Sequence, residues 1–224
     1  MADYLQAFRF YLSVGTNAID RIVFVDNSNS DLSPLRQVAE EARGMKDVEL
    51  ISYEGLNYPV EQGRSVGETY LIDHALAASR ILSALGTNEL FWKVTGRLRV
   101  RNLAQLVAST PGDCDFYIDF RRYRHPWVDT RIFATTPGAF RRLFLNRIDI
   151  LRQDLLPPSF VAPEERLFWA LLPEREPERI APRLCVEPLI EGTSGFGENY
   201  RRPRRRVESA VRRVTRRVLP SLWI

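Results

Sequence analysis

The chain contains 224 residues, of which 45% are hydrophobic, 27% charged and 11% aromatic. This length suits one domain of ordinary size and excludes a large multidomain protein, and the composition excludes both a disordered chain and a small scaffold held by disulfides. The net charge of +4 is uneven, because residues 200–224 carry nine arginines and one glutamate, which leaves a net charge of −4 on the remainder. An acidic body argues against a nucleic-acid-binding surface spread over the fold.

The cysteines and the hydropathy of the chain predict a cytoplasmic protein. Cys114 and Cys185 match neither a metal-site spacing nor a dense disulfide framework, which is typical of a reducing compartment. No run of about 18 apolar residues occurs, and Asp3 and Arg9 interrupt the start of the chain, where an export signal needs an apolar stretch. We therefore expect no membrane span.

Hydrophobic periodicity predicts that helices and strands alternate along most of the chain. In chain order these are a helix over residues 3–15, a strand over 22–25, a helix over 34–42, a strand over 48–53, a helix over 68–85, a strand over 90–94, a helix over 102–108, strands over 116–120 and 131–135, helices over 137–151 and 163–172, and a strand over about 184–190. Alternation of this kind predicts an α/β layered fold with a mostly parallel sheet, helices on both faces and sites at the carboxyl ends of strands. We expect one domain over residues 1–199 and a basic tail over 200–224.

Five segments of the sequence share the pattern of one enzyme family. They read RIVFVDNSNSDL, GRSVGETYLIDHAL, LFWKVTGRLRVRNL, EERLFWAL and VEPLIEGTSG. Together they resemble bacterial glycosyltransferases with a GT-A fold, of the kind that acts in capsular polysaccharide and lipopolysaccharide assembly. The resemblance extends from Asp3 to about Asn199 and implies a GT-A-like, Rossmann-like fold. Similar sequences usually carry one more strand ahead of the first helix, which we expect to be missing here.

The resemblance implies that a sugar is transferred from a nucleotide-sugar donor to a hydroxyl of a cell-surface glycan or lipid-linked acceptor. The residues that match the donor-binding positions of such enzymes are Asp26, Asn27, Ser28, Gly63, Gly67, Glu68, Lys93, Thr95, Gly96, Arg97 and Asn102. Asp26 would accept hydrogen bonds from the nucleoside, although an Asx-turn that closes the strand explains the same residues. Gly63, Gly67 and Glu68 would lie close to the donor, and a plain helix start is the alternative.

Transfer requires positive charge beside the departing nucleoside diphosphate. Most GT-A enzymes hold a divalent metal with an Asp-x-Asp motif at the end of a strand, but this strand ends in Lys93-Val94-Thr95-Gly96-Arg97. Lys93 and Arg97 would supply the charge directly, unless they form surface ion pairs. No metal ligand is assigned, because Asp113-Cys114-Asp115 precedes its strand and is interpreted as a turn. A requirement for manganese or magnesium stays open.

Transfer also requires a carboxylate that takes the proton of the acceptor hydroxyl. Glu164 and Glu165 head a predicted helix and resemble the acidic pair of inverting enzymes, with Glu165 slightly favoured because it lies nearer the apolar face. The alternative for this pair is that both carboxylates only stabilise the N-terminus of the helix through its dipole. Asp119, at the end of a strand, is a further candidate, either as an acceptor-side carboxylate or as a lone metal ligand, unless Arg121 and Arg122 only neutralise it.

The tail predicts a basic amphipathic helix. Val207, Val211, Val214, Val218 and Leu222 form one stripe, and arginines occupy the sides and back of the helix. Trp223 and Ile224 follow as candidate interfacial anchors; these two residues and Leu222 lie outside the part of the chain that the structure describes. This pattern suits an anionic membrane surface as partner through residues 205–224 and a peripheral location on the inner face of the cytoplasmic membrane. Coverage of the domain's own apolar surface is the alternative. Nucleic acid is an improbable partner, because stacking aromatics are not interleaved with the arginines.

The competing function for the whole chain is that of a catalytically inactive relative, which keeps the GT-A fold and acts as a binding or interaction module.

Overall fold

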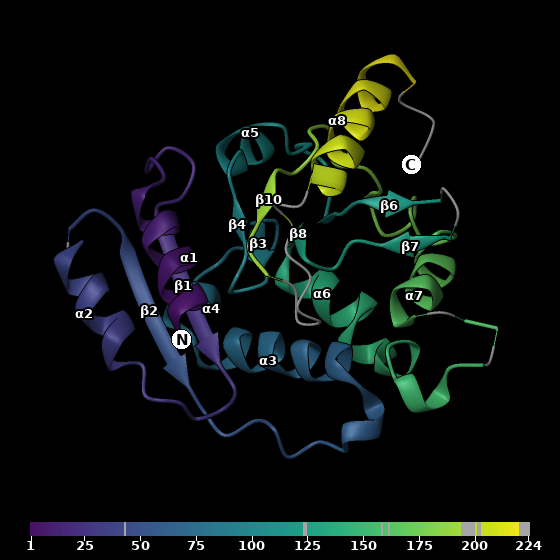
Figure 1. Cartoon of the computed structure of the whole chain (residues 1–224). Coiled ribbons are helices and arrows are strands. Elements are labelled where there is room, and N and C mark those ends of the chain that lie inside the picture. Colours follow the sequence, from purple (N-terminus) through teal and green to yellow (C-terminus); the bar gives the residue numbers. More distant parts are fainter. Residues whose placement is uncertain are drawn as a thin grey trace.

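The computed structural model describes residues 1–42, 44–122, 125–157, 159–160, 162–193, 200 and 203–219, apart from the side chains of 203–206. The described residues form two regions that each contain a sheet, and the long helix α3 (Arg64–Ala78) extends along both of them (Figure 1). A short 3-10 turn, η1 (Val60–Gln62), leads into this helix.

The first region is a small parallel sheet covered by helices. Its elements are α1 (Ala2–Ser13), β1 (Arg21–Asp26), α2 (Ser33–Glu41) and β2 (Asp47–Ser52). β1 and β2 pair in parallel, with Arg21 opposite Asp47. Apolar residues of the two helices, among them Phe8 and Leu35, are buried against Phe24 and its neighbours and form a separate hydrophobic cluster. The helices are therefore held to this sheet by apolar burial.

The helix predicted over residues 68–85 is divided into α3 and α4 (Arg80–Ser83). Ser79 between them has an extended backbone, and its hydroxyl accepts a hydrogen bond from an α4 backbone N–H. The same hydroxyl donates to Glu49 of β2 over 2.6 Å, and Glu49 also accepts backbone N–H groups from the start of α4. A carboxylate from a neighbouring strand thus caps α4 and fixes the break.

The second region contains a four-stranded sheet, in the order β3-β8-β5-β9, and two pairs of short strands, β4 with β10 and β6 with β7. The strands are β3 (Phe91–Val94), β4 (Arg99–Val100), β5 (Phe116–Tyr117), β6 (Phe120–Arg121), β7 (Trp127–Val128), β8 (Ile132–Thr135), β9 (Ile180–Ala181) and β10 (Ile190–Glu191). The helices are α5 (Leu103–Ala108), α6 (Pro137–Leu143), η2 (Leu145–Ile150), η3 (Gln153–Leu155), α7 (Pro163–Leu171) and α8 (Pro203–Val218).

The expectation of a mostly parallel sheet, and with it of a GT-A-like layered fold, is wrong. Among the described strands only the pairs β1–β2 and β5–β9 are parallel, whereas β3–β8, β5–β8, β6–β7 and β4–β10 are antiparallel. A parallel neighbour needs a crossover connection of a dozen or more residues, usually a helix. The described residues from 116 to 135 contain four strands and no helix, so the pairs β5–β8 and β6–β7 are antiparallel. The structure is a mixed α/β fold with small sheets.

Two further predicted elements are shorter than expected. The strand predicted over 184–190 is reduced to β10, because the side-chain amide of Asn102 hydrogen bonds the backbone of Glu187 and Leu189 in place of a strand partner. The helix predicted over 137–151 ends as α6 at Leu143, and the 3-10 helix η2 follows. At this turn Phe144 stacks on two other buried phenylalanines, Phe133 and Phe140.

Strand β8 lies in the middle of the main core and all four of its residues are buried. Phe133 belongs to a cluster with α3, α6 and α7, and Ile132 and Ala134 belong to a second cluster with α5 and Tyr117. Because successive strand residues point to opposite faces, β8 contributes to both clusters. The four-stranded sheet is therefore covered by apolar side chains on both faces.

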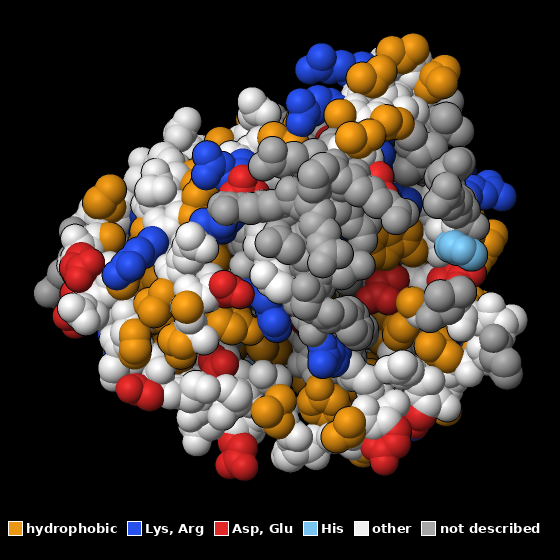
Figure 2. Space-filling view, in the orientation of Figure 1, with side chains coloured by type: hydrophobic (Ala, Val, Ile, Leu, Met, Phe, Trp, Pro, Cys, Tyr) orange, Lys and Arg blue, Asp and Glu red, His pale blue; other side chains and the backbone are white. Residues whose placement is uncertain are grey.

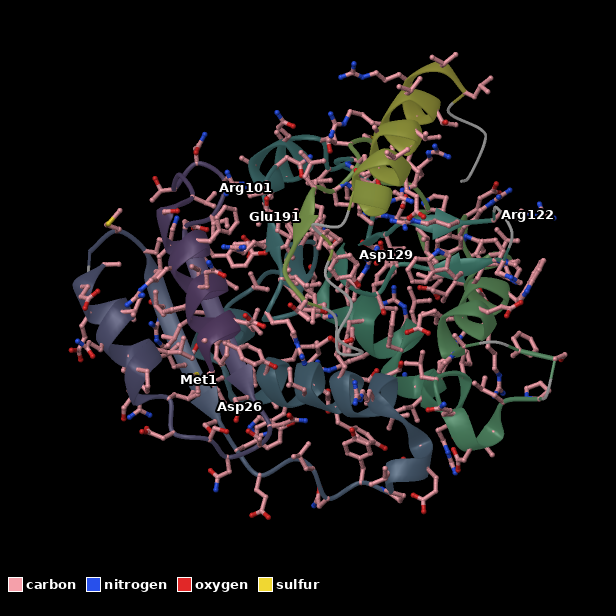
Figure 3. All side chains as sticks on the ribbon, viewed as in Figure 1. Met1, Asp26, Arg101, Arg122, Asp129 and Glu191 are labelled. Atoms are coloured by element: carbon pink, nitrogen blue, oxygen red, sulfur yellow. The ribbon has the colours of Figure 1, made fainter. Side chains whose placement is uncertain are left out.

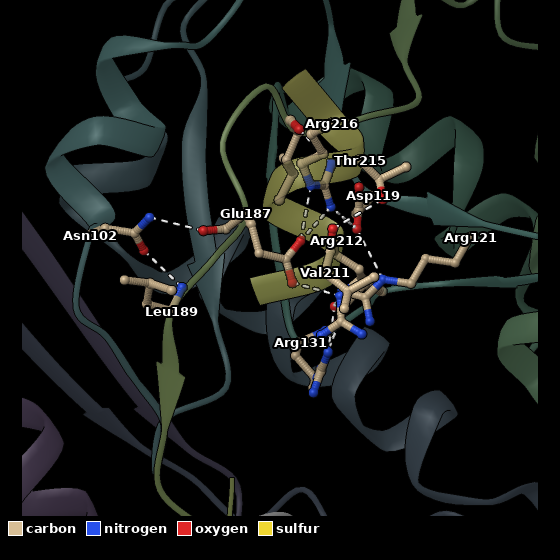
Figure 4. A network of polar contacts seen from close by, with 12 residues as sticks. Asn102, Asp119, Arg121, Arg131, Glu187, Leu189, Val211, Arg212, Thr215 and Arg216 are labelled. Atoms are coloured by element: carbon tan, nitrogen blue, oxygen red, sulfur yellow. Dashed lines mark hydrogen bonds and ion pairs between the residues drawn. The ribbon is translucent and has the colours of Figure 1, made fainter. Parts of the chain in front are cut away.

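Helix α8 is attached through its charged side. Arg216 donates to Asp119 over 2.6 Å, to Glu187 over 2.9 Å and to the Leu184 carbonyl over 2.6 Å, and Arg212 donates to Glu187 over 2.7 Å (Figure 4). The side chains of Arg216, Asp119 and Glu187 are at most 4% exposed. Burial disfavours the charged form of Arg216, but the two carboxylates outweigh burial and raise its pKa.

The apolar stripe of α8 faces outward. Val207, Val211, Val214 and Val218 are 52–68% exposed, and apolar side chains line the outer edge of this helix in Figure 2. At 3.6 residues per turn, Arg212 and Arg216 lie on the side opposite the stripe. The stripe therefore does not cover the domain's own apolar surface, which was one of the two alternatives for the tail.

We predict that Arg216→Ala lowers the free energy of unfolding by about 3–5 kcal/mol, because it leaves two buried carboxylates without their cation. The exposed Arg213 of the same helix provides the matched control, and Arg213→Ala should change stability by about 0.5 kcal/mol or less. Urea unfolding of both variants measures the difference. Equal small effects would contradict the structural role of the buried arginine.

Candidate functional site

A cleft of about 960 Å³ separates the two regions. Its walls are β1 and β3, with α1 on one side and α3 and α4 on the other. Its interior is largely apolar, and polar groups from Asp26, Glu68, Lys93, Thr95 and Arg97 line the end at which both β1 and β3 finish. We call this end the polar mouth. Eight of the predicted donor-binding residues thus line this cleft, which are the five named above together with Asn27, Gly67 and Gly96.

Lys93 is paired inside the cleft. Its Nζ lies 2.5 Å from Oε1 of Glu68 and donates to the Thr130 carbonyl over 2.7 Å and to the Thr95 hydroxyl over 3.2 Å. The Lys93 side chain is 8% exposed, and its Nζ lies 5.6 Å from the centre of the Phe133 ring. The sequence prediction that Lys93 points into a site is compatible with this position, but Glu68 already balances its charge.

Arg97 is the cation at the mouth whose hydrogen-bonding capacity is unused. Its Nε is buried and has no hydrogen-bond partner among the described residues. The guanidinium lies over the ring of Tyr4, 5.6 Å from its centre, and this ring also lines the cleft. A planar guanidinium with free donors matches the two oxygens of a phosphate or carboxylate group. The mouth can therefore receive an anion at Arg97.

The Asp26 loop is closed by hydrogen bonds to the carboxylate of Asp26. Oδ2 of Asp26 accepts hydrogen bonds from the backbone N–H groups of Ser28 and Ser30 over 3.1 Å and from the Ser28 hydroxyl over 2.8 Å. The Asn27 carbonyl accepts the N–H of Gly55, which ties the loop to the segment after β2. This is the Asx-turn that the sequence offered as an alternative. Figure 3 shows Asp26 at the end of β1. All three hydrogen bonds of the turn go to Oδ2, so the other carboxylate oxygen of Asp26, Oδ1, is not used in the turn.

The glycines near the cleft make room for aromatic rings. A Cβ on Gly67 would lie 2.2 Å from the hydroxyl oxygen of Tyr58, and a Cβ on Gly96 would lie 3.2 Å from the ring of Tyr4. Gly63 has a φ of +86° and starts α3, a conformation that suits glycine. The ring of Tyr58 thus explains the glycine at position 67, and the ring of Tyr4 explains the glycine at position 96. The sequence gave no reason to expect that these two tyrosines pack against the two glycines.

Glu164 is the carboxyl group that best suits proton transfer. Burial raises its pKa, and the charges of Glu68 and Asp129 raise it further. Glu164 does not itself line the cleft, but its charge interacts with that of Glu68, which does. The sequence slightly favoured Glu165 of the pair, whereas the electrostatics favour Glu164, because a base with a raised pKa accepts a proton more readily near neutral pH.

Two predicted site residues lie elsewhere. Asp119 is 1% exposed and is bound to Arg121 over 3.0 Å and to Arg216, so it belongs to the attachment of α8. Burial opposes its ionisation, but both arginines outweigh burial and lower its pKa. The Oδ1 atom of Asp119 is buried and has no hydrogen-bond partner in the described part of the chain. Asn102 uses its amide to hold the backbone before β10, and it does not line the cleft.

The sequence analysis missed the second acidic centre of this network. Asp129 is buried between Arg121, at 2.7 Å, and Arg131, at 2.6 Å, below α8 in the view of Figure 3. Burial opposes ionisation, but the arginines lower its pKa. Asp119 and Arg121, like Asp129 and Arg131, are two residues apart, so each pair shares one face of an extended segment. This spacing was the available signal.

In the described part of the chain, no group of three or more acidic, histidine or cysteine side chains has the arrangement of a metal site. No helix of the described residues is long and apolar enough to cross a bilayer. Comparison with protein-family models, curated proteins and solved structures yields no match to this chain.

We predict that Glu164 makes stability fall with rising pH. Its folded pKa lies above the ordinary value of 4.5, so the unfolded chain loses this proton first. Between the two pKa values the free energy of unfolding declines, and the loss persists above the folded pKa. Glu164→Gln should therefore stabilise the protein relative to the unaltered chain near pH 7 but not near pH 3, as measured by urea unfolding. Glu165→Gln is the control, and a Glu164→Gln effect independent of pH would contradict the prediction.

Proposed function

We propose that the protein is a glycosyltransferase that moves a sugar from a nucleotide-sugar donor to a hydroxyl of a cell-surface glycan or lipid-linked acceptor. The observation that carries the proposal is the half-buried Arg97, whose buried Nε has no hydrogen-bond partner among the described residues and whose guanidinium lies at the polar mouth of a large cleft. The cleft volume of about 960 Å³ lies within the range that is usual for small-molecule binding sites, so a nucleotide can be accommodated. The sequence resemblance supplies the reaction class.

Arg97 would bind the diphosphate of the donor. Negative charge grows on the leaving diphosphate as the glycosidic bond breaks, and a guanidinium that is already in position stabilises it without reorganisation. Lys93 lies beside Thr95 with its ammonium group held in place, and its charge balanced, by Glu68. Thr95 lies within hydrogen-bond distance of both and contributes a hydroxyl to the same surface.

Glu164 would take the proton of the acceptor hydroxyl. Its raised pKa makes it a stronger base than an ordinary glutamate, and its charge interacts with that of Glu68, which lines the cleft. The acceptor would therefore approach from the α7 side of the cleft, where this residue heads the helix. Asp119 has no part in this proposal, because its carboxylate is bound by two arginines.

We predict that Arg97→Ala weakens nucleoside diphosphate binding at least tenfold, because hydrogen bonds to a charged group contribute about 1.5–3 kcal/mol. Calorimetric titration with UDP, GDP, CDP and TDP, each with and without manganese, identifies the nucleotide and measures any contribution of a cation. Arg101→Ala is the matched control, since Arg101 is exposed, lies over Phe10 and does not line the cleft. Absence of binding to all four nucleotides would refute the donor assignment.

A binding or interaction module without turnover is the competing function. It has the same nucleotide affinity and the same sensitivity to Arg97→Ala. Assays of donor hydrolysis and of sugar transfer on the purified protein separate the two, because only the enzyme releases the nucleoside diphosphate from the sugar. Nucleotide binding without any release would favour the module.

We also propose that α8 attaches the protein to an anionic membrane surface, on the inner face of the cytoplasmic membrane. The four exposed valines form an apolar stripe, and the exposed Arg213 and Arg217 lie beside it. The buried ion pairs of Arg212 and Arg216 hold the helix so that this stripe faces solvent. Apolar contact and attraction of basic residues to anionic lipid are the two contributions to such binding.

We predict cosedimentation with vesicles that contain phosphatidylserine and weaker binding to phosphatidylcholine vesicles, with a loss of binding at high salt. Each basic residue near the lipid contributes about 1 kcal/mol. Val211→Asp combined with Val214→Asp should abolish the association, while Val60→Asp, at an exposed valine outside α8, should not. Equal binding to both lipids, or an unaffected double variant, would contradict the role of the helix.

A further inference from the structure

The charged residues beneath α8 form one continuous chain of ion pairs in which arginines and carboxylates alternate. Each of its three carboxylates, on Asp129, Asp119 and Glu187, binds two arginines. In order, the chain consists of Arg131, Asp129, Arg121, Asp119, Arg216, Glu187 and Arg212. It therefore begins and ends with an arginine, and no described carboxylate joins the two ends.

The two ends of this chain lie close together. Figure 4 shows the guanidinium groups of Arg131, Arg212 and Arg121 gathered below α8. Arg121 and Arg131 bind the same oxygen, Oδ2 of Asp129, over 2.7 and 2.6 Å. Burial, and then the charges of Arg121 and Arg131, lower the pKa of Arg212, although Glu187 opposes them. Arg212 thus lies in a positive field that its own carboxylate partner does not balance.

The cluster carries more positive than negative charge. Arg183 lies near it as well, and its pKa is lowered by burial and then by the charge of Arg216. With Arg183, the described cluster contains five arginines and three carboxylates, which leaves a surplus of two positive charges. Like charges that are partly withdrawn from water repel strongly unless an anion lies between them.

The arginines at the open ends also have hydrogen-bond donors to spare. Arg212 donates from Nε to Glu187, while its two Nη groups donate to no described residue. Nη1 of Arg121 is likewise unused within the described part of the chain. Arg216, in contrast, donates from all three nitrogens. The side chains of Arg121, Arg131 and Arg212 are 9%, 21% and 19% exposed, so a small solute can reach them.

We propose that the gap between Arg131 and Arg212 binds a phosphate group with two negative charges, which closes the alternating chain into a ring. A phosphate monoester carries about −1.5 to −2 charges at pH 7 and has three acceptor oxygens, so it matches both the surplus charge and the unused donors. A carboxylate has one charge and two oxygens, and would balance half of the surplus. Inorganic phosphate and the phosphate of a larger molecule share this chemistry.

The site is partly formed before the ligand arrives. The guanidinium groups of Arg121 and Arg131 lie over the Trp127 ring, 5.2 and 5.5 Å from its centre, and Asp129 binds both. The site is also separate from the polar mouth, because neither these two arginines nor Arg212 lines the cleft. The inference therefore does not depend on the proposed enzyme activity.

Calorimetric titration of the full chain tests the proposal, at an ionic strength held constant with chloride. The ligands are glycerol 3-phosphate, inorganic phosphate and dimethyl phosphate, a diester with a single charge. The first or the second should bind at least tenfold more tightly than the diester, and the tighter of the two identifies an organic phosphate or the free ion as the source. Equal affinity for the diester, or binding of none of the three, would overturn the proposal.

Variants locate the phosphate. Arg212→Ala should weaken its binding at least tenfold, and the fold is expected to persist because Glu187 keeps Arg216. Arg213→Ala, at an exposed neighbour on α8, and Arg97→Ala, at the polar mouth, should bind within about twofold of the unaltered chain. A loss in Arg97→Ala that Arg212→Ala does not show would place the anion in the cleft and refute the proposal.

Urea unfolding gives an independent measurement, because a ligand that binds only the folded state stabilises it. Phosphate should raise the urea midpoint of the unaltered chain but not that of a folded Arg212→Ala. Glu198 lies outside the described residues, and Glu198→Gln tests whether a carboxylate of the chain itself occupies the gap. Phosphate affinity should be unchanged in this variant. An affinity raised tenfold or more, or an equal midpoint shift in Arg212→Ala, would contradict a phosphate at this position.

Discussion

The separation of β1 from β3 is the constraint on which the rest of the structure depends. Two helices maintain it: α1 covers the sheet of the first region and also reaches β4 through the Tyr11 hydroxyl, which donates to the Leu98 carbonyl over 2.9 Å. α3 lies on the opposite side and contacts β1 as well as the second region. Because these helices are buried against both regions, the cleft between the strands is part of the folded state.

The cleft combines two environments that one continuous sheet would not provide. Its interior is apolar, and its mouth carries a paired lysine and an arginine whose Nε has no hydrogen-bond partner among the described residues. The apolar interior excludes water, and the polar mouth suits an anion.

A second charge system determines the position of α8. The ordinary arrangement of an amphipathic helix buries its apolar stripe, but here Arg216 is buried between Asp119 and Glu187 and the valines are exposed. Removal of charges from water is costly unless each finds its partners, and the network of Figure 4 supplies them. The outward orientation of the stripe follows from this network, and it leaves an apolar, arginine-flanked surface for a partner.

The sequence by itself determined most elements, because each depends on local patterns. Periodicity predicted α1, β1, β2, β3 and β8, and the Asx-turn at Asp26 was among its alternatives. The membership of Lys93, Thr95 and Arg97 in one cleft also agrees with their position after a strand. Strand direction, in contrast, depends on which segments meet, so the expectation of a mostly parallel sheet was wrong.

Only the tertiary structure decided which charges meet. Asp119 was a candidate acceptor-side residue, but Arg216, which lies 97 positions away along the chain, binds its carboxylate. In the same way, the pKa of Glu164 is raised first by burial and then by the charges of Glu68 and Asp129, which are distant in sequence. Local propensity and turn chemistry act over a few residues, whereas burial, pairing and the field at a carboxylate arise from segments that folding brings together.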